Sequence, residues 1–164
     1  MRHSARNIWL VSLAIILASC SKPWQETIRY GELSNSSFSE TIPFENKLGL
    51  AIVKVKIGQE FYDFLFDTGA PLTVSNKLHE RFKYKVLSSG GFRDSENQRT
   101  TVEYVEVPSI LIGKQEFVNQ TAVVTNFENN PLIKCLQIDG IIGSNLMRYC
   151  NWTIDFSELS LIHI

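Results

Sequence analysis

The chain has 164 residues, with 16 Lys and Arg against 17 Asp and Glu, so its formal net charge is -1. This near-neutral balance argues against a nucleic-acid-binding protein. The 44% hydrophobic content excludes collagen-like, low-complexity and charge-dominated disordered chains. The 3 Cys are too few for a disulfide scaffold or a four-cysteine zinc site. The length suits one domain with its own core.

The N-terminus has the order of features found in an export signal. A basic start precedes the apolar run 8–17, which is shorter than the ~20 residues needed to cross a bilayer. The run ends in Leu17-Ala18-Ser19-Cys20, which resembles the lipobox of bacterial lipoproteins. The resemblance implies a signal peptide over residues 1–19 and acylation of Cys20. It also implies anchoring in a lipid bilayer on the extracytoplasmic side of the bacterial cell envelope. An ordinary secretory signal is the alternative.

The polar segment that follows, residues 20–41, is rich in Ser and Asn toward its end. This composition predicts a tether between the lipid and the domain, although part of it could add an edge strand. The folded domain is expected over residues 42–164.

The rest of the chain is predicted to be mainly β, because short apolar or alternating stretches follow one another with turn residues between them. The expected strands are 48–57, 61–66, 72–75, 101–107, 110–112, 117–125, 136–142, 152–156 and 159–164. Short helices are expected at 76–82 and 144–149, a loop at 128–131 and a turn-rich segment at 86–99. Together these elements indicate a closed or folded-over β domain.

Candidate chemistry lies where the apolar strand Phe64-Leu65-Phe66 meets Asp67-Thr68-Gly69-Ala70. This stretch resembles the active-site motif of aspartic proteases. Two further features follow in the order found in retroviral-type enzymes: the glycine-bearing stretch 88–92, at the position of the flap, and Ile141-Ile142-Gly143 before a short helix. The resemblance implies a single-lobe, retropepsin-like acid-protease β-barrel with one or two short helices.

For function, the resemblance implies an aspartic endopeptidase that hydrolyses peptide bonds of an extended peptide or protein substrate. Asp67, Thr68 and Gly69 would be catalytic. Two adjacent carboxylates share one proton, so one serves as base and the other as acid toward a water molecule. Because the chain has one such motif, the second carboxylate is expected from Asp67 of an identical subunit in a homodimer. No metal or other cofactor is implied.

The resemblance also indicates substrate-contacting positions, in the flap and beside the catalytic motif. These are Ala70, Gly90, Gly91, Phe92, Ile141 and Ile142. Where the family has an arginine after its Ile-Ile-Gly segment this chain has Ser144, so Arg148 is a candidate to help hold the dimer. The alternative function is a non-catalytic envelope lipoprotein that binds extended peptides in a protease-like groove.

The remaining reactive residues have ordinary interpretations. Asp63 lies ~13 Å before Asp67 along an extended strand and is therefore not expected to be its dyad partner. Asp139 precedes Gly140 and is expected in a turn. Cys135 and Cys150 flank the Ile-Ile-Gly segment. They form either a disulfide, favoured by an oxidising compartment, or two buried free thiols.

Overall fold

The computed structural model describes residues 28, 30–35, 38–93 and 99–163. Its strands are β1 (Glu32–Leu33), β2 (Glu40–Lys47), β3 (Leu50–Ile57), β4 (Glu60–Phe66), β5 (Thr73–Ser75), β6 (Lys85–Arg93), β7 (Arg99–Ile112), β8 (Gln115–Thr125), β9 (Gly140–Ile142), β10 (Trp152–Asp155) and β11 (Ser160–His163). The helices are α3 (Asn76–Phe82), α4 (Pro131–Leu136), α5 (Ser144–Met147) and the 3-10 turn η1 (Phe127–Asn129). The prediction of a mainly β domain with short helices is confirmed.

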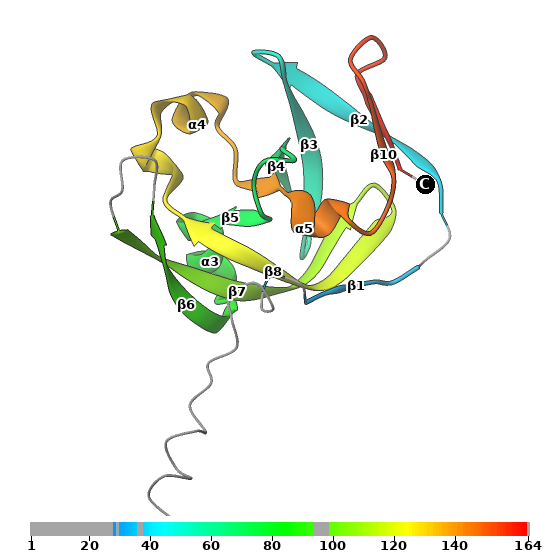
Figure 1. Ribbon diagram of the computed structural model, residues 1–164. Helices are drawn as coiled ribbons and strands as arrows, with labels where there is room; N and C mark the ends of the chain where they lie inside the picture. Colours follow the sequence, from blue (N-terminus) through cyan, green and yellow to red (C-terminus); the bar gives the residue numbers. More distant parts are fainter. Residues whose placement is uncertain (1–27, 29, 36–37, 94–98, 164) are drawn as a thin grey trace, which may run out of the picture.

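All the strands belong to one 11-stranded sheet with the order β10-β11-β2-β3-β4-β9-β5-β8-β7-β6, and β1 pairs with β8 outside this path. An additional pairing between β3 and β7 joins strands that are distant in the order, so the middle of the sheet folds back on itself. The strands from β3 to β7 thereby form a closed ring. The β10–β11 and β6–β7 hairpins are at opposite ends of the strand order and on opposite sides of the domain (Figure 1).

The main core fills the ring of strands. Its fully buried side chains come from strands far apart in sequence, because alternate residues of each strand point inward. They include Val53, Phe64, Ile110, Phe117 and Leu161. A smaller cluster lies under α4 and is formed by Ile52, Leu65, Phe127, Leu136, Ile138 and Ile141.

The expected strand over residues 136–142 is wrong in its first part. Asn130 begins α4, because its side-chain oxygen accepts hydrogen bonds from the N–H groups of Leu132 and Ile133, and Pro131 occupies the first helical turn. The helix continues to Leu136, so only Gly140–Ile142 remains as β9. The loop expected at 128–131 is instead divided between η1 and the start of α4.

The N-terminal part of the domain contains structure that the sequence analysis left open or missed. Within the segment interpreted as a tether, Glu32–Leu33 forms the edge strand β1 along β8, the alternative noted above. Glu40–Lys47 forms the unpredicted β2, whose Ile42 and Phe44 are buried. The predicted signal peptide and Cys20 lie outside the described residues. Among the residues that are described, no helix is long and apolar enough to cross a membrane.

Candidate active site

The Asp67 loop, residues 67–72, connects β4 to β5. β4 pairs in parallel with β9, with Phe66 opposite Ile142, so the loop leaves the sheet beside the end of β9. The backbone N–H of Asp67 donates to the carbonyl of Ile142 at 3.1 Å. The Asp67 side chain is half-buried, and its Oδ1 accepts a hydrogen bond from the N–H of Gly69 at 2.8 Å. The turn therefore fixes the direction of the carboxylate.

The start of α5 holds the other end of the loop. The N–H and hydroxyl of Ser144 both donate to the carbonyl of Ala70, at 2.9 and 3.2 Å. Just before them, Gly143 lies so close that a Cβ there would be 2.1 Å from the carbonyl carbon of Pro71 and 2.4 Å from the carbonyl oxygen of Ala70. The close approach explains why glycine occupies this position.

Asn145 connects the loop to two further segments. Its Oδ1 accepts from the N–H of Leu72 at 2.6 Å, and its Nδ2 donates to the carbonyls of Thr121 at 2.9 Å and Ile28 at 3.4 Å. Leu72 and Thr121 are fully buried. One side chain thus satisfies backbone groups of three segments that are far apart in sequence, and it holds the loop against β8.

A cleft of about 740 Å³ opens beside the loop. The Asp67 loop and α5 form one side and the β6–β7 hairpin the other, so the cleft lies between the candidate carboxylate turn and the candidate flap. Its lining residues are Ile28, Gly69, Ala70, Pro71, Thr73, Gly90, Gly91, Val102, Tyr104, Val123, Thr125, Ser144, Asn145 and Arg148. This lining is mostly apolar or backbone, which suits an extended peptide with apolar side chains.

The structure brings together many of the predicted site residues. Gly69, Ala70, Gly90 and Gly91 line the cleft, and Thr68 is exposed on the loop beside it. The two flap glycines are not at the tip of the hairpin. They lie within β6, where Gly90 pairs with Val102 and Gly91 with Thr101. Their missing side chains leave space in the cleft rather than forming the turn.

Two predicted substrate-contacting residues lie elsewhere. Ile142 is fully buried in the main core and Ile141 is buried in the smaller cluster under α4, so the prediction that they contact substrate is corrected for this chain. Both belong to β9, which is paired on both sides by β4 and β5 and buried throughout. Phe92 lies in β6, and its side chain is outside the described part of the structure.

Several cleft residues were not predicted from the sequence. Tyr104 and Val123 are paired on neighbouring strands, and Asn145 and Arg148 belong to α5 and its C-terminal end. The alternation of side chains along β7 and β8 indicates which residues share a face of the sheet. It does not indicate that this face contacts the Asp67 loop. Arg148, a candidate to hold a dimer, donates to the Tyr149 hydroxyl at 2.7 Å, and its guanidinium lies 4.7 Å from the centre of that ring.

The two other aspartates near β4 do not supply a second carboxylate. Asp63 forms an ion pair with Lys54 at 2.5 Å. Asp139 accepts from the Asp63 N–H through Oδ2 at 3.1 Å, while its own N–H donates to the Asp63 carbonyl at 2.7 Å. Asp63 lies four residues before Asp67 on β4, or ~13 Å along the strand, and Asp139 lies beside Asp63. Burial raises the pKa of Asp139 above its usual range.

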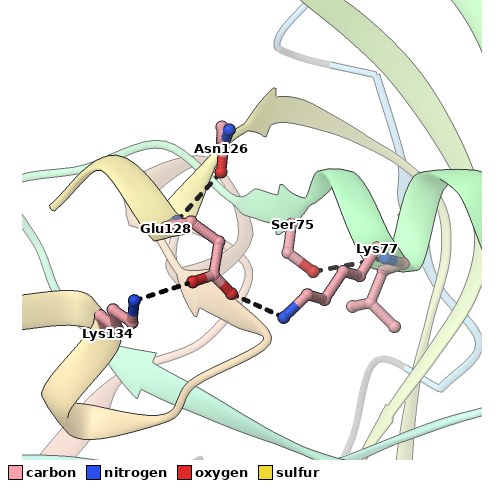
Figure 2. A network of polar contacts seen from close by, with 6 residues as sticks. Ser75, Lys77, Asn126, Glu128 and Lys134 are labelled. Atoms are coloured by element: carbon pink, nitrogen blue, oxygen red, sulfur yellow. Dashed lines mark hydrogen bonds and ion pairs between the residues drawn. The ribbon is translucent and has the colours of Figure 1, made fainter.

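A second hollow, of about 390 Å³, contains Asp139 and lies between α3, η1 and α4. Figure 2 shows the polar contacts at its rim, where the Glu128 carboxylate lies between the ammonium groups of Lys77 and Lys134, at 2.7 and 3.6 Å. The hydrogen bond from Lys77 lowers the pKa of Glu128. These charges are exposed and already paired with one another, so they tie η1 to the two helices rather than forming a second reactive site.

The two cysteines considered as a disulfide are free thiols in this structure. Cys135 is exposed on α4, whose apolar residues pack on the smaller cluster, whereas Cys150 packs against the main core. Burial raises the pKa of the Cys150 thiol to about 11.

Comparisons with known proteins agree with this geometry. The family model for aspartyl proteases matches residues 53–146, more than half of the chain, and the chain therefore belongs to the aspartyl protease family. The match includes the Asp67 loop, both arms of the candidate flap and the first residues of α5. The aspartic protease family expected from the sequence is thereby confirmed.

Two solved structures are similar to this chain. A retropepsin-like aspartic protease from Rickettsia conorii has a TM-score of 0.54 at 18% identity, covering 82% of this chain and 93% of that one. The retroviral protease-like domain of Ddi1 from Leishmania major has a TM-score of 0.45 at 14% identity, covering 70% and 94%. No curated protein matches the chain. At these identities the first structure supports the fold alone.

Proposed function

We propose that this protein is an aspartic endopeptidase that works as a homodimer, with one Asp67 from each subunit. The observation that carries the proposal is the Asp67 carboxylate itself. It is half-buried and oriented by the Gly69 N–H, and the residues that follow it in the loop, Gly69, Ala70 and Pro71, line a cleft whose other side is the β6–β7 hairpin. Family membership supports the same proposal, because proteases of this class use a pair of aspartates to cleave peptide bonds.

The chemistry requires both carboxylates. With one proton shared between them, the ionised Asp67 removes a proton from a water molecule, which attacks the carbonyl carbon of the peptide bond. The protonated Asp67 stabilises the developing oxyanion by donating a hydrogen bond. A proton then passes to the leaving nitrogen, and the carbon–nitrogen bond breaks without a covalent intermediate. Thr68, exposed beside Asp67, would contact the backbone of the second subunit across the two-fold axis.

A mixing experiment tests the dyad. The full chain, solubilised in detergent, is assayed against a peptide library from about pH 4 to pH 7, with its mass followed by sedimentation. Asp67→Asn is expected to abolish cleavage while Asp63→Asn, four residues earlier on β4, retains it. An equal mixture of wild type and Asp67→Asn should have about one quarter of the all-wild-type activity, because only that share of random dimers has two aspartates. The mixture is unfolded and refolded together so that the subunits exchange, and a value of one half would then contradict a dyad shared between subunits.

A second candidate function is peptide binding without cleavage. It is favoured by one observation: the residues of one chain already form a cleft of about 740 Å³ beside the Asp67 loop. This function predicts that a monomeric protein binds extended peptides and that Asp67→Asn leaves their affinity unchanged. Cleavage that depends on Asp67 would exclude it.

We also propose that Cys20 is acylated and anchors the protein to the bacterial cell envelope. The support is the order of features in the sequence: a basic start, a short apolar run, small residues and a cysteine. Acyl chains contribute about 0.8 kcal/mol per buried CH₂, so more than one chain would give stable anchoring. Incorporation of labelled palmitate in bacteria should occur in the wild type and be lost in Cys20→Ser. Incorporation that persists in the variant would refute the assignment.

A further inference from the structure

The N-terminal strap, which we define as Ile28 and residues 30–34, runs antiparallel along β8 toward the cleft. Its far end is held where the Ser34 N–H donates to the Glu116 carbonyl at 3.1 Å. Its middle pairs as β1, with Glu32 opposite Val118. Closer to the cleft, the Thr121 N–H donates to the Tyr30 carbonyl at 3.4 Å. The strap is therefore an added edge strand rather than a loose extension.

Polar side chains hold the strap in place. Gln120 is fully buried, and its Nε2 donates to the carbonyl of Glu32 at 3.1 Å. The Tyr149 hydroxyl donates to the carbonyl of Gly31 at 2.6 Å. Gly31 has φ of +134°, and a Cβ at this position would lie 2.3 Å from the Gln120 Nε2. Glycine is thus required both by the backbone conformation and by the closeness of Gln120.

The strap ends at the candidate active site. The Ile28 carbonyl accepts from the Nδ2 of Asn145, whose Oδ1 holds the Leu72 N–H of the Asp67 loop. The half-buried Ile28 lines the cleft together with Ala70 and Pro71. The same amide side chain thereby links the strap to the loop, and the chain's own N-terminal segment contributes to the wall of the cleft.

We propose that the strap closes one end of the peptide-binding cleft and that Ile28 determines an apolar specificity subsite there. This inference rests on the proposed function. An extended peptide lying between the Asp67 loop and the β6–β7 hairpin meets Ile28 at the α5 side of the cleft. A substrate side chain at this position contacts Ile28, Ala70 and Pro71, so it is aliphatic or aromatic. Loss of one such apolar contact changes preference by about tenfold or more.

The first experiment measures preference at each substrate position. The full chain and its Ile28→Ala and Ile28→Lys variants are assayed with a peptide library varied at one position at a time. Ile28→Lys should lower kcat/KM for apolar residues at a single position by about tenfold or more and favour acidic residues there. Ile28→Leu should retain the apolar preference. All other positions should keep their wild-type preferences.

A second experiment displaces the strap without changing Ile28. Gly31→Val introduces a side chain against Gln120, whereas the control Gly49→Val changes another positive-φ glycine, in the β2–β3 turn, where a Cβ would meet nothing within 4 Å. Gly31→Val should increase hydrogen exchange of the strap amides. It should also weaken the preference for apolar residues at the substrate position that Ile28→Lys affects. Gly49→Val should leave both unchanged.

Binding in the Asp67→Asn background separates this inference from the proposed catalysis. If the wild type does not cleave but Ile28→Lys changes which library peptides bind, the endopeptidase proposal is refuted and the subsite proposal is supported. If cleavage depends on Asp67 but Ile28→Lys preserves every preference, the subsite assignment fails alone. Faster cleavage of all peptides alike in Gly31→Val would mean that the strap blocks the cleft, and would overturn the assignment. A chain that neither binds nor cleaves any library peptide overturns both.

Discussion

Replacing Asn145 should disconnect the Asp67 loop from the rest of the fold. In Asn145→Ala, the buried Leu72 N–H loses the Asn145 acceptor, and the Thr121 carbonyl loses the hydrogen bond from Asn145. An unsatisfied buried N–H costs about 1–3 kcal/mol and a lost hydrogen bond about 0.5–1.5 kcal/mol, so the expected destabilisation is about 2–4 kcal/mol. For a domain of this size that corresponds to a decrease in melting temperature of roughly 6–12 °C.

Asn145→Asp separates the contribution of the Asn145 acceptor from that of its donor. A carboxylate retains the acceptor for the Leu72 N–H but removes the donor and faces the Thr121 carbonyl with negative charge. It should therefore be less stable than wild type by about 1–3 kcal/mol, while retaining the link to the loop. Urea unfolding measures both variants, with Asn151→Ala as an exposed control expected within about 0.5 kcal/mol of wild type. If Asn145→Ala unfolds like Asn151→Ala, the assignment of Asn145 as the connection is refuted.

Three further predictions concern the surroundings of the site. Gly143→Ala places a Cβ 2.1 Å from the Pro71 carbonyl carbon and should cost at least about 1–3 kcal/mol in urea unfolding and decrease cleavage; Gly91→Ala, where a Cβ meets nothing within 4 Å, should not alter stability. The raised pKa of Asp139 means that the folded state retains its proton to higher pH than the unfolded chain, so its contribution to stability falls as pH rises above the ordinary carboxyl pKa. Asp139→Asn keeps an acceptor for the Asp63 N–H, so its stability relative to wild type should increase from pH 3 to pH 7, as measured by thermal unfolding; an unchanged difference would refute the assigned pKa direction. Ser75→Ala removes the α3 cap from the Leu78 N–H and should cost about 1 kcal/mol in urea unfolding without changing substrate preference; no loss would show that the cap is not stabilising.

The sequence alone was sufficient for features that depend on neighbouring residues. The apolar and alternating stretch 48–57 correctly predicted the strand β3, and the stretch 76–82 correctly predicted the helix α3. The Asp67-Thr68-Gly69 stretch identified the candidate site because, after an apolar strand, it resembles the active-site motif of aspartic proteases. These patterns are local, so they can be read without knowing the tertiary structure.

Some local signals were present but assigned to the wrong element. Asn130-Pro131 is a helix start that was interpreted as part of a loop, and the apolar residues after it then suggested a strand. The alternation of Ile42 and Phe44 in β2 was not used, because the preceding polar segment suggested a tether. Short apolar runs fit either a strand or a helix, so their flanking residues decide the assignment.

Only the tertiary structure decided which residues share the cleft. Ile28 and Asn145 are separated by 117 positions, yet a hydrogen bond joins them beside the Asp67 loop. Ile141 and Ile142 lie near that loop in the fold but face the two core clusters instead of the cleft. Strand periodicity specifies which side chains share a face, whereas long-range pairing of β1 with β8 and β9 with β4 determines what that face contacts. The sequence was therefore sufficient to identify the motif, whereas the fold was needed to show which residues form the wall of the cleft.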